Sequence, residues 1–194
     1  MKYLSPALAL MAALMLHGQA AYAGSITFMG DLSGANEVPP TPSPGTGVVT
    51  VILDPASQKL EEKVTFSDLT APDAMAHIHC CAPLGTNVGV ATALPALSGF
   101  PLGVTSGTFD QTFDLTNSAF YNPAFVTANG GSVAKAEAKL VAGIEAEQTY
   151  FNIHTGNFPS GEIRSQLFEV PEPASLALLG SALFGFGLMR RRRG

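Results

Sequence analysis

The chain has 194 residues, of which 13% are charged and 46% hydrophobic, and its formal net charge is −5. Residues 24–170 alone hold fourteen acidic against five basic residues, so this central body is more acidic than the whole chain. A body of this size can bury a sizeable core. Its acidity excludes the basic surface that nucleic-acid binding needs, so we expect no nucleic-acid partner.

The N-terminus has the features of a secretory signal peptide. Lys2 supplies a positive charge, residues 4–16 are apolar with two exceptions, and residues 21–23 read Ala-Tyr-Ala, a small-x-small cleavage pattern. We predict a signal helix within residues 1–23, handled by the Sec translocon and signal peptidase, and a mature chain that begins near Gly24. A permanent N-terminal anchor is disfavoured because the apolar run is short for a membrane span.

Residues 24–170 predict one mainly β domain. Short runs of alternating or β-branched apolar residues are separated by Gly, Pro, Asn and Asp, which is typical of strands and turns. The predicted strands are 25–32, 48–53, 60–66, 74–81, 107–115, 149–155 and 161–168. About seven short strands favour a Greek-key-like β-sandwich or a partly closed barrel.

Two details of this pattern lead to further structural predictions. In the strand 60–66, Glu62 shares its parity with three apolar residues, which indicates either a mixed face or an irregular strand. Residues 132–147 break the alternation with apolar residues at helical spacing, and Ser132 is a plausible N-cap. We predict one helix there that packs on the sheet, although Gly143 weakens its last turn.

One stretch of the fourth strand carries residues that could bind a metal. In a strand, His77 and His79 share one face, whereas Ala76, Ile78 and Cys80 point to the other, core-facing side. Met75 and Cys81 have the same parity as the two histidines. The stretch could therefore present a thioether, two imidazoles and a thiolate in a row.

A second group of polar residues lies in the last two strands. Asn152 and His154 point away from the apolar face of their strand, and Glu162 and Arg164 do so in the next one. A hairpin joining the strands would place His154, Glu162 and Arg164 on a common face. The three histidines of the body, and its single arginine, are all on such predicted polar faces.

Two interpretations of these residues remain open. In the first, His77, His79 and His154 bind copper or zinc, with Cys81, Met75 or Glu162 as additional ligands. In the second, they belong to a hydrogen-bonded structural cluster. That cluster would comprise Glu37, Asn152, Glu162 and Arg164 together with the histidines.

The adjacent cysteines Cys80 and Cys81 could adopt any of three states. In an oxidising compartment free thiols tend to be consumed. The first state is a vicinal disulfide, which would be strained because neighbouring Cα atoms in a trans peptide are about 3.8 Å apart, below the usual disulfide range. The second is metal ligation, and the third is free or intermolecular thiols.

The tail of the chain has three parts in a fixed order. Pro171, Glu172 and Pro173 precede an uncharged apolar run at 174–189, which is followed by Arg190, Arg191, Arg192 and Arg193. Physically this is a short hydrophobic helix with a basic end that would face the cytoplasm. The order resembles the PEP-CTERM sorting signal of Gram-negative bacteria. That resemblance implies processing by an exosortase near Pro171–Pro173, after which the body is released or transferred to the cell envelope.

Four motifs of the body resemble the CHRD domain, a module named for the extracellular animal protein chordin. They are 32–40 (LSGANEVPP), 76–79 (AHIH), 150–155 (YFNIHT) and 161–164 (GEIR). The resemblance implies an extracellular β-sandwich-like domain and no generally assigned enzymatic activity.

The stretch His77-Ile-His79 is also similar to the copper-ligand pair of copper/zinc superoxide dismutases. The bridging histidine and the remaining zinc ligands have no counterpart in the chain, so we do not expect dismutase activity. The chain also lacks the common nucleophile and phosphate-binding motifs.

The sequence thus predicts three segments: a signal peptide at 1–23, a CHRD domain at 24–170 and a sorting signal at 171–194. We expect a membrane-anchored precursor, held by the C-terminal helix, that ends at the cell surface, in the outer envelope or in the extracellular matrix. There it would act as a non-enzymatic structural or interaction module, with an envelope or exopolysaccharide partner that the sequence does not name. Copper or zinc binding at the histidine face is the second function that the residues allow.

Overall fold

A computed structural model describes residues 24–171 of the chain. The predicted signal helix and the predicted hydrophobic C-terminal helix lie outside these residues, as do Glu172, Pro173 and the four terminal arginines. Within residues 24–171, no helix combines the length and the apolar character that a membrane span requires.

Residues 24–171 contain eight strands, two α-helices and two short 3₁₀ turns. The strands are β1 (Ile26–Ser33), β2 (Thr46–Asp54), β3 (Lys59–Ser67), β4 (Asp73–Cys80), β5 (Gly107–Asp114), β6 (Thr149–Thr155), β7 (Ile163–Gln166) and β8 (Phe168–Glu169). The helices are α2 (Pro123–Ala128) and α3 (Val133–Glu145), and the 3₁₀ turns are Gly34–Asn36 and Ser118–Phe120. All seven predicted strands are present; the last is divided, because β7 ends at Gln166 and β8 begins at Phe168.

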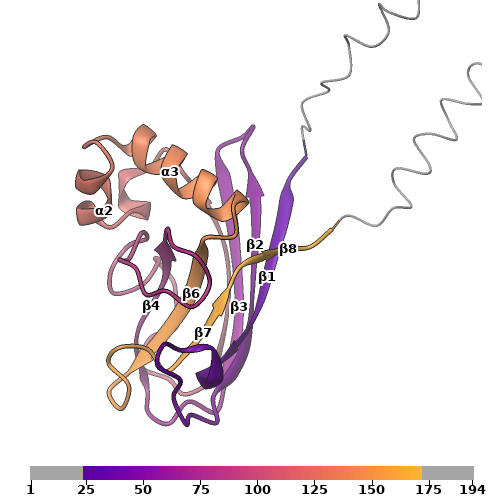
Figure 1. Cartoon of the computed structure of the whole chain (residues 1–194), viewed down its shortest axis with the longest axis vertical. Helices are drawn as coiled ribbons and strands as arrows, with labels where there is room; N and C mark the ends of the chain where they lie inside the picture. The colour runs from indigo at the N-terminus through magenta and orange to yellow at the C-terminus, as the bar shows by residue number, and fades with distance from the viewer. Residues whose placement is uncertain (1–23, 172–194) are drawn as a thin grey trace, which may run out of the picture.

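The strands form one antiparallel sheet in the order β4-β6-β7-β1-β2-β3-β5, and β8 adds to β1 beside β7. The sheet curls into an open half-barrel, and α2 and α3 lie together at one end of it (Figure 1). Of the two architectures that the sequence predicts, the partly closed barrel is therefore the one present.

The concave side of β2 and β3 forms the apolar core. Val49, Val51 and Leu53 of β2 are fully buried, and they alternate with partly exposed residues. In β3 the register with β2 is continuous, so Glu62 is part of a mixed face and not of an irregular entry. Its side chain is only 1% exposed.

The predicted helix is confirmed as α3. The Ser132 side chain accepts a hydrogen bond from the Lys135 backbone N–H at its start, as expected of an N-cap. Ala136, Leu140 and Ile144 are fully buried in the core. The short helix α2, which begins after Asn122, is not predicted by the sequence.

The strand β4 lies at one edge of the sheet, yet its free edge is covered. The backbone N–H of Ala91 donates to Ile78 O, and that of Ala76 donates to Pro95 O, so the chain after β4 folds back along it. Ala76, Ile78 and Cys80 point into the core, as predicted. The opposite face of β4 is also buried, which strand alternation does not indicate, and this face carries the histidines.

Candidate metal centre

Strand register brings the three histidines together from two neighbouring strands. In the antiparallel pair of β4 and β6, Met75 lies opposite His154, His77 opposite Asn152, and His79 opposite Tyr150. Residues directly opposite in such a pair project on the same face of the sheet. His77, His79 and His154 therefore share one face. The sequence places each of them on the polar face of its strand, and the pairing of β4 with β6 joins the two faces.

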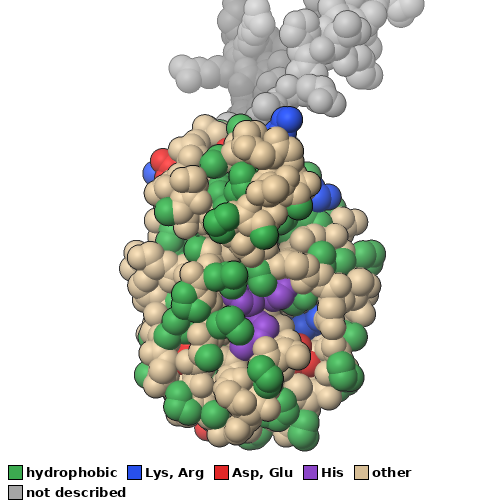
Figure 2. All heavy atoms as spheres, turned by 90° about the vertical axis from the view of Figure 1, so that its left-hand side faces the viewer, with side chains coloured by type: hydrophobic (Ala, Val, Ile, Leu, Met, Phe, Trp, Pro, Cys, Tyr) green, Lys and Arg blue, Asp and Glu red, His purple; other side chains and the backbone are tan. Residues whose placement is uncertain are grey.

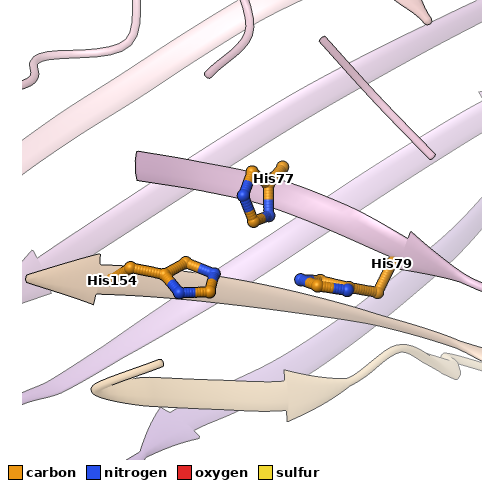
Figure 3. Close-up of side chains that lie close together, drawn as sticks. All are labelled: His77, His79 and His154. Carbon is orange, nitrogen blue, oxygen red and sulfur yellow. The ribbon is translucent and has the colours of Figure 1, made fainter. Parts of the chain in front are cut away.

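The three imidazole rings surround a common point. Their nearest potential ligand atoms all lie within 4.8 Å of one another. The ring centroid of His77 is 4.8 Å from that of His79 and 4.7 Å from that of His154 (Figure 3). In the space-filling view the histidines lie at the floor of a hollow that opens to the surface (Figure 2).

Backbone carbonyls fix the orientation of two of the rings. His79 Nδ1 lies 2.6 Å from the carbonyl oxygen of Val88, and His154 Nδ1 lies 3.1 Å from that of Pro159. A carbonyl only accepts, so each Nδ1 carries the proton and donates it, which leaves Nε2 with a free lone pair. Hydrogen bonds of this kind orient histidine ligands in metal sites.

The inward-facing nitrogens have no partner. Three buried ring nitrogens lack any hydrogen bond within the described residues: His77 Nδ1, His79 Nε2 and His154 Nε2. Each side chain is at least nine-tenths buried. An unsatisfied buried polar atom costs about 1 to 3 kcal/mol, so three of them in one place call for an explanation.

Burial keeps all three histidines neutral. It lowers the pKa of His77 to about 3, with a further contribution from His79 and His154, which would repel a second positive charge. Burial lowers the pKa of His79 to about 4, and the hydrogen bond to Val88 opposes this only in part. The pKa of His154 is lowered for the same reason. Neutral imidazole is the form that binds metal ions.

A stacked layer of side chains supports His79. The Tyr150 ring lies parallel to the His79 ring, with centroids 4.4 Å apart, and the guanidinium carbon of Arg164 lies 4.2 Å from the Tyr150 centroid. Arg164 donates a hydrogen bond of 2.7 Å to Asn87 Oδ1. Asn87 in turn donates to Val38 O, so this layer ties two loops to the sheet.

Glu37 and Asn152 form a second polar pair next to the histidines. Asn152, which lies between His77 and Arg164 across the strands, donates to Glu37 Oε2 at 3.4 Å. Burial raises the pKa of Glu37 to about 7, although Arg164 and the bond from Asn152 oppose the rise. Gly161 has a φ of 128° and lies too close to both side chains for any Cβ.

Glu162 lies away from the histidines, contrary to the predicted common face. Its carboxylate accepts hydrogen bonds from Ser43 Oγ (2.6 Å), from the backbone N–H and hydroxyl of Thr70 (2.7 and 3.1 Å), and from Thr155 Oγ1. Burial tends to raise its pKa, but these donors outweigh that effect and lower it. Glu162 thus anchors two loops to β6, and the predicted structural cluster is divided into two separate groups.

The two cysteines also lie outside the histidine group. Cys80 and Cys81 form a vicinal disulfide, one of the three states that the sequence allows. The sulfur atoms pack against Gly143 of α3, where an added Cβ would lie 2.5 and 2.6 Å from them. Of the predicted ligands, the structure therefore unites the three histidines and leaves Cys81 and Glu162 elsewhere.

Some residues of the site were missed by sequence reasoning. Tyr150 has the same parity as Asn152 and His154, so its place on this face could have been inferred. Asn87 and the carbonyl groups of Val88 and Pro159 belong to irregular segments with no periodic pattern. Nothing in the sequence indicates that they contact the histidines or Arg164.

The curled sheet and its face of three buried imidazoles define a small antiparallel β-domain with a candidate metal centre. The chain belongs to the CHRD domain family, whose model matches residues 28–167. The PEP-CTERM protein-sorting motif matches residues 169–193. Comparison with curated proteins and with solved structures gave no match.

Both family resemblances that the sequence indicates are thereby confirmed. The sorting motif implies an exosortase-processed, exported protein of Gram-negative bacteria, anchored in the membrane before processing. Neither match names a ligand or a partner for the histidine face.

Proposed function

We propose that the exported CHRD domain binds one copper or zinc ion through His77, His79 and His154. The observation that carries the proposal is the convergence of three buried ring nitrogens that have no hydrogen-bond partner among the described residues. A metal ion would satisfy all three at once.

A purely structural role for the histidines explains less. In a structural cluster most buried polar atoms find a partner, as both carboxylate oxygens of Glu162 do with their four donors. In His79 and His154 the hydrogen-bonded Nδ1 atom instead faces outward, toward a backbone carbonyl. The ring nitrogens without a hydrogen bond are directed toward one another. This is the arrangement of a ligand set with its supporting contacts.

The donor atoms favour copper or zinc over other common ions. Imidazole nitrogen suits both metals, whereas magnesium and calcium require oxygen ligands. The candidate group contains no carboxylate from the described residues. Three protein ligands also leave one coordination position, which would face the hollow seen in Figure 2.

The role that the sequence favours most, a structural or interaction module, is the second candidate. It is supported by a groove of about 330 Å³ between the segments 37–42 and 157–161. Pro39, Pro42 and Phe158 give the groove an apolar lining. An envelope or exopolysaccharide partner would bind there, and such binding is compatible with a metal in the neighbouring histidine site.

Metal content tests the first candidate directly. The full chain is exported by its own signals, extracted from the envelope without a histidine-rich tag, and measured by inductively coupled plasma mass spectrometry. We expect close to one copper or zinc ion per chain, and none in a His77→Ala/His79→Ala variant that retains its fold. A Thr108→Ala/Gln111→Ala variant, altered at two exposed positions of β5, is the matched control.

One result of the metal analysis would contradict the proposal. A wild-type protein that retains neither metal, even after both are supplied during purification, contradicts metal binding. The interaction module then becomes the better candidate, to be pursued by capture of envelope polysaccharide on the immobilised protein.

A further inference from the structure

A methionine lies on the histidine face, directly beside the three rings. Met75 is the cross-strand partner of His154, and it precedes His77 by two residues on β4. The register of β4 and β6 is continuous from Met75 to Cys80, so Met75 projects on the same face as His77 and His79. Its side chain is half-buried, whereas those of the histidines are buried.

Strand geometry allows the thioether to reach a metal held by the histidines. Directly opposite residues in an antiparallel pair have Cβ atoms about 4.5 to 5.5 Å apart, and residues two apart on one strand are separated by roughly 6.6 Å. Methionine is unbranched and has three rotatable bonds. Its sulfur can therefore approach an ion bound to His154 and His77 without any change in the backbone.

No other sulfur of the described residues competes for this position. Cys80 and Cys81 are joined to each other and pack against Gly143. Met29, the other methionine in residues 24–171, is 40% exposed and lies on β1, which is not adjacent to β4 or β6 in the sheet.

We propose that Met75 is the fourth ligand of the centre and makes it selective for copper(I). The inference rests on the proposed metal site. Thioether is a soft, uncharged ligand that suits copper(I), whereas the sulfur ligand of zinc sites is the charged cysteine thiolate. The neutral histidines and their burial also favour the ion of lower charge, because a monovalent cation is less costly to remove from water than a divalent one.

Competition titrations of the full chain test this selectivity. Metal-free protein, extracted from the envelope, is titrated with copper(I) against a chromogenic copper(I) chelator, anaerobically and with ascorbate as reductant. A thiol assay verifies that the Cys80–Cys81 disulfide remains closed. Zinc affinity is measured in parallel with a zinc indicator.

The informative variant is Met75→Leu, which removes the sulfur and keeps the apolar volume. We expect it to weaken copper(I) binding at least about tenfold, or ~1.4 kcal/mol, and to change zinc affinity by less than about twofold. Met29→Leu, the same change on a distant strand, should alter neither. X-ray absorption of the copper(I) protein should show a sulfur neighbour that is absent in Met75→Leu.

Each remaining outcome contradicts the inference in a distinct way. Wild-type copper(I) affinity in Met75→Leu, with the same absorption spectrum, excludes the thioether ligand but leaves the three-histidine site intact. Equal weakening of copper(I) and zinc binding would make Met75 a packing residue. A wild-type chain that binds neither ion contradicts the metal site itself.

Discussion

The two halves of the sheet bury titratable groups in opposite ways. On β4, β6 and β7 the histidines, Asn152 and Arg164 are buried as neighbours, and all but His77 donate a hydrogen bond to a loop residue. On β2 and β3 the concave face is apolar, with Glu62 as the exception. Glu62 Oε2 has no hydrogen-bond partner among the described residues.

This difference separates a polar site whose members contact one another from a single buried carboxyl group. The polar half holds groups that stabilise one another's orientation and keep bases neutral by lowering their pKa. The apolar half keeps the acid Glu62 neutral by raising its pKa to about 8, through burial alone. His77, His79 and Glu62 are thus neutral near pH 7, but their protonation makes stability respond to pH with opposite signs.

The largest expected effect comes from Glu62→Gln. Above pH 4.5 the unfolded chain releases this proton, whereas the folded chain holds it until about pH 8, so Glu62 makes stability fall as pH rises through that window. Gln does not titrate. Relative to wild type, the free energy of unfolding of the variant should rise by about 4 to 5 kcal/mol between pH 4.5 and pH 8. Urea unfolding at several pH values measures this difference.

Glu61→Gln is the matched control for this variant. Glu61 is the preceding residue of β3, and its side chain lies on the opposite, partly exposed face. It measures what the same substitution does on the partly exposed face, where Glu61 forms an ion pair with Lys63. A difference between Glu62→Gln and wild type that does not change with pH would mean that Glu62 is hydrated or paired in solution, and the contrast between the two halves would disappear.

His77→Gln should show the opposite pH dependence in metal-free protein. The folded pKa of His77 is about 3, below the usual 6.5 of the unfolded chain. As pH falls below 6.5 the unfolded state takes up a proton that the folded state refuses, so stability is lost. Relative to wild type, the free energy of unfolding of the variant should therefore rise by about 1.4 kcal/mol for each pH unit of acidification from pH 6.5 to 4.5.

Urea unfolding after chelator treatment measures this difference. Added copper or zinc should reduce the variant's advantage within this pH window, because a bound metal stabilises only the protein that retains His77. If the two proteins lose stability in parallel on acidification, His77 is solvated in the folded state and does not belong to a buried, neutral ligand set.

Glu162→Gln tests whether the two polar groups are separate. The substitution removes the charge that four hydrogen bonds share, so we expect a loss of roughly 1 to 3 kcal/mol in the free energy of unfolding. Metal content should remain that of wild type, because Glu162 faces Ser43 and Thr70. A metal content as low as that of the His77→Ala/His79→Ala variant would instead support the sequence-based prediction that Glu162 is a metal ligand.

The behaviour of Glu162 also shows where sequence reasoning reaches its limit. Strand alternation placed His77, His79 and His154 on the polar faces of their strands, and the sequence pattern located every strand to within a few residues. The same rule failed at Glu162 because β7 begins only at Ile163, after Gly161 with its positive φ. Alternation holds inside a regular strand and carries no information about the residue that precedes it.

The sequence pattern also does not predict that the histidine face is buried. The face is covered by irregular segments, among them the residues around Val88 and Pro159, which contribute carbonyl groups. A carbonyl is present in every residue, so residue type does not mark its role. The grouping of the three histidines was therefore predictable, whereas the contacts that orient them were not.

Gly143→Ala is the smallest expected effect, and it tests why a helix-weakening residue occurs in α3. Replacing glycine by alanine in a helix normally gains up to about 1 kcal/mol. Here the new Cβ would meet both sulfur atoms of the Cys80–Cys81 disulfide, and overpacking of this kind costs about 1 to 3 kcal/mol. The net result, measured by urea unfolding, should be a loss of about 1 kcal/mol.

Ala138→Gly, at an exposed position of the same helix, measures the ordinary cost of glycine in α3. If Gly143→Ala instead stabilises the protein by the amount that Ala138→Gly destabilises it, the disulfide does not press on the helix. The close contact at Gly143 would then be no constraint on α3, and the helix could shift without moving β4 or its histidines. A loss at Gly143 would instead show that the helix is held against the end of β4, next to His79.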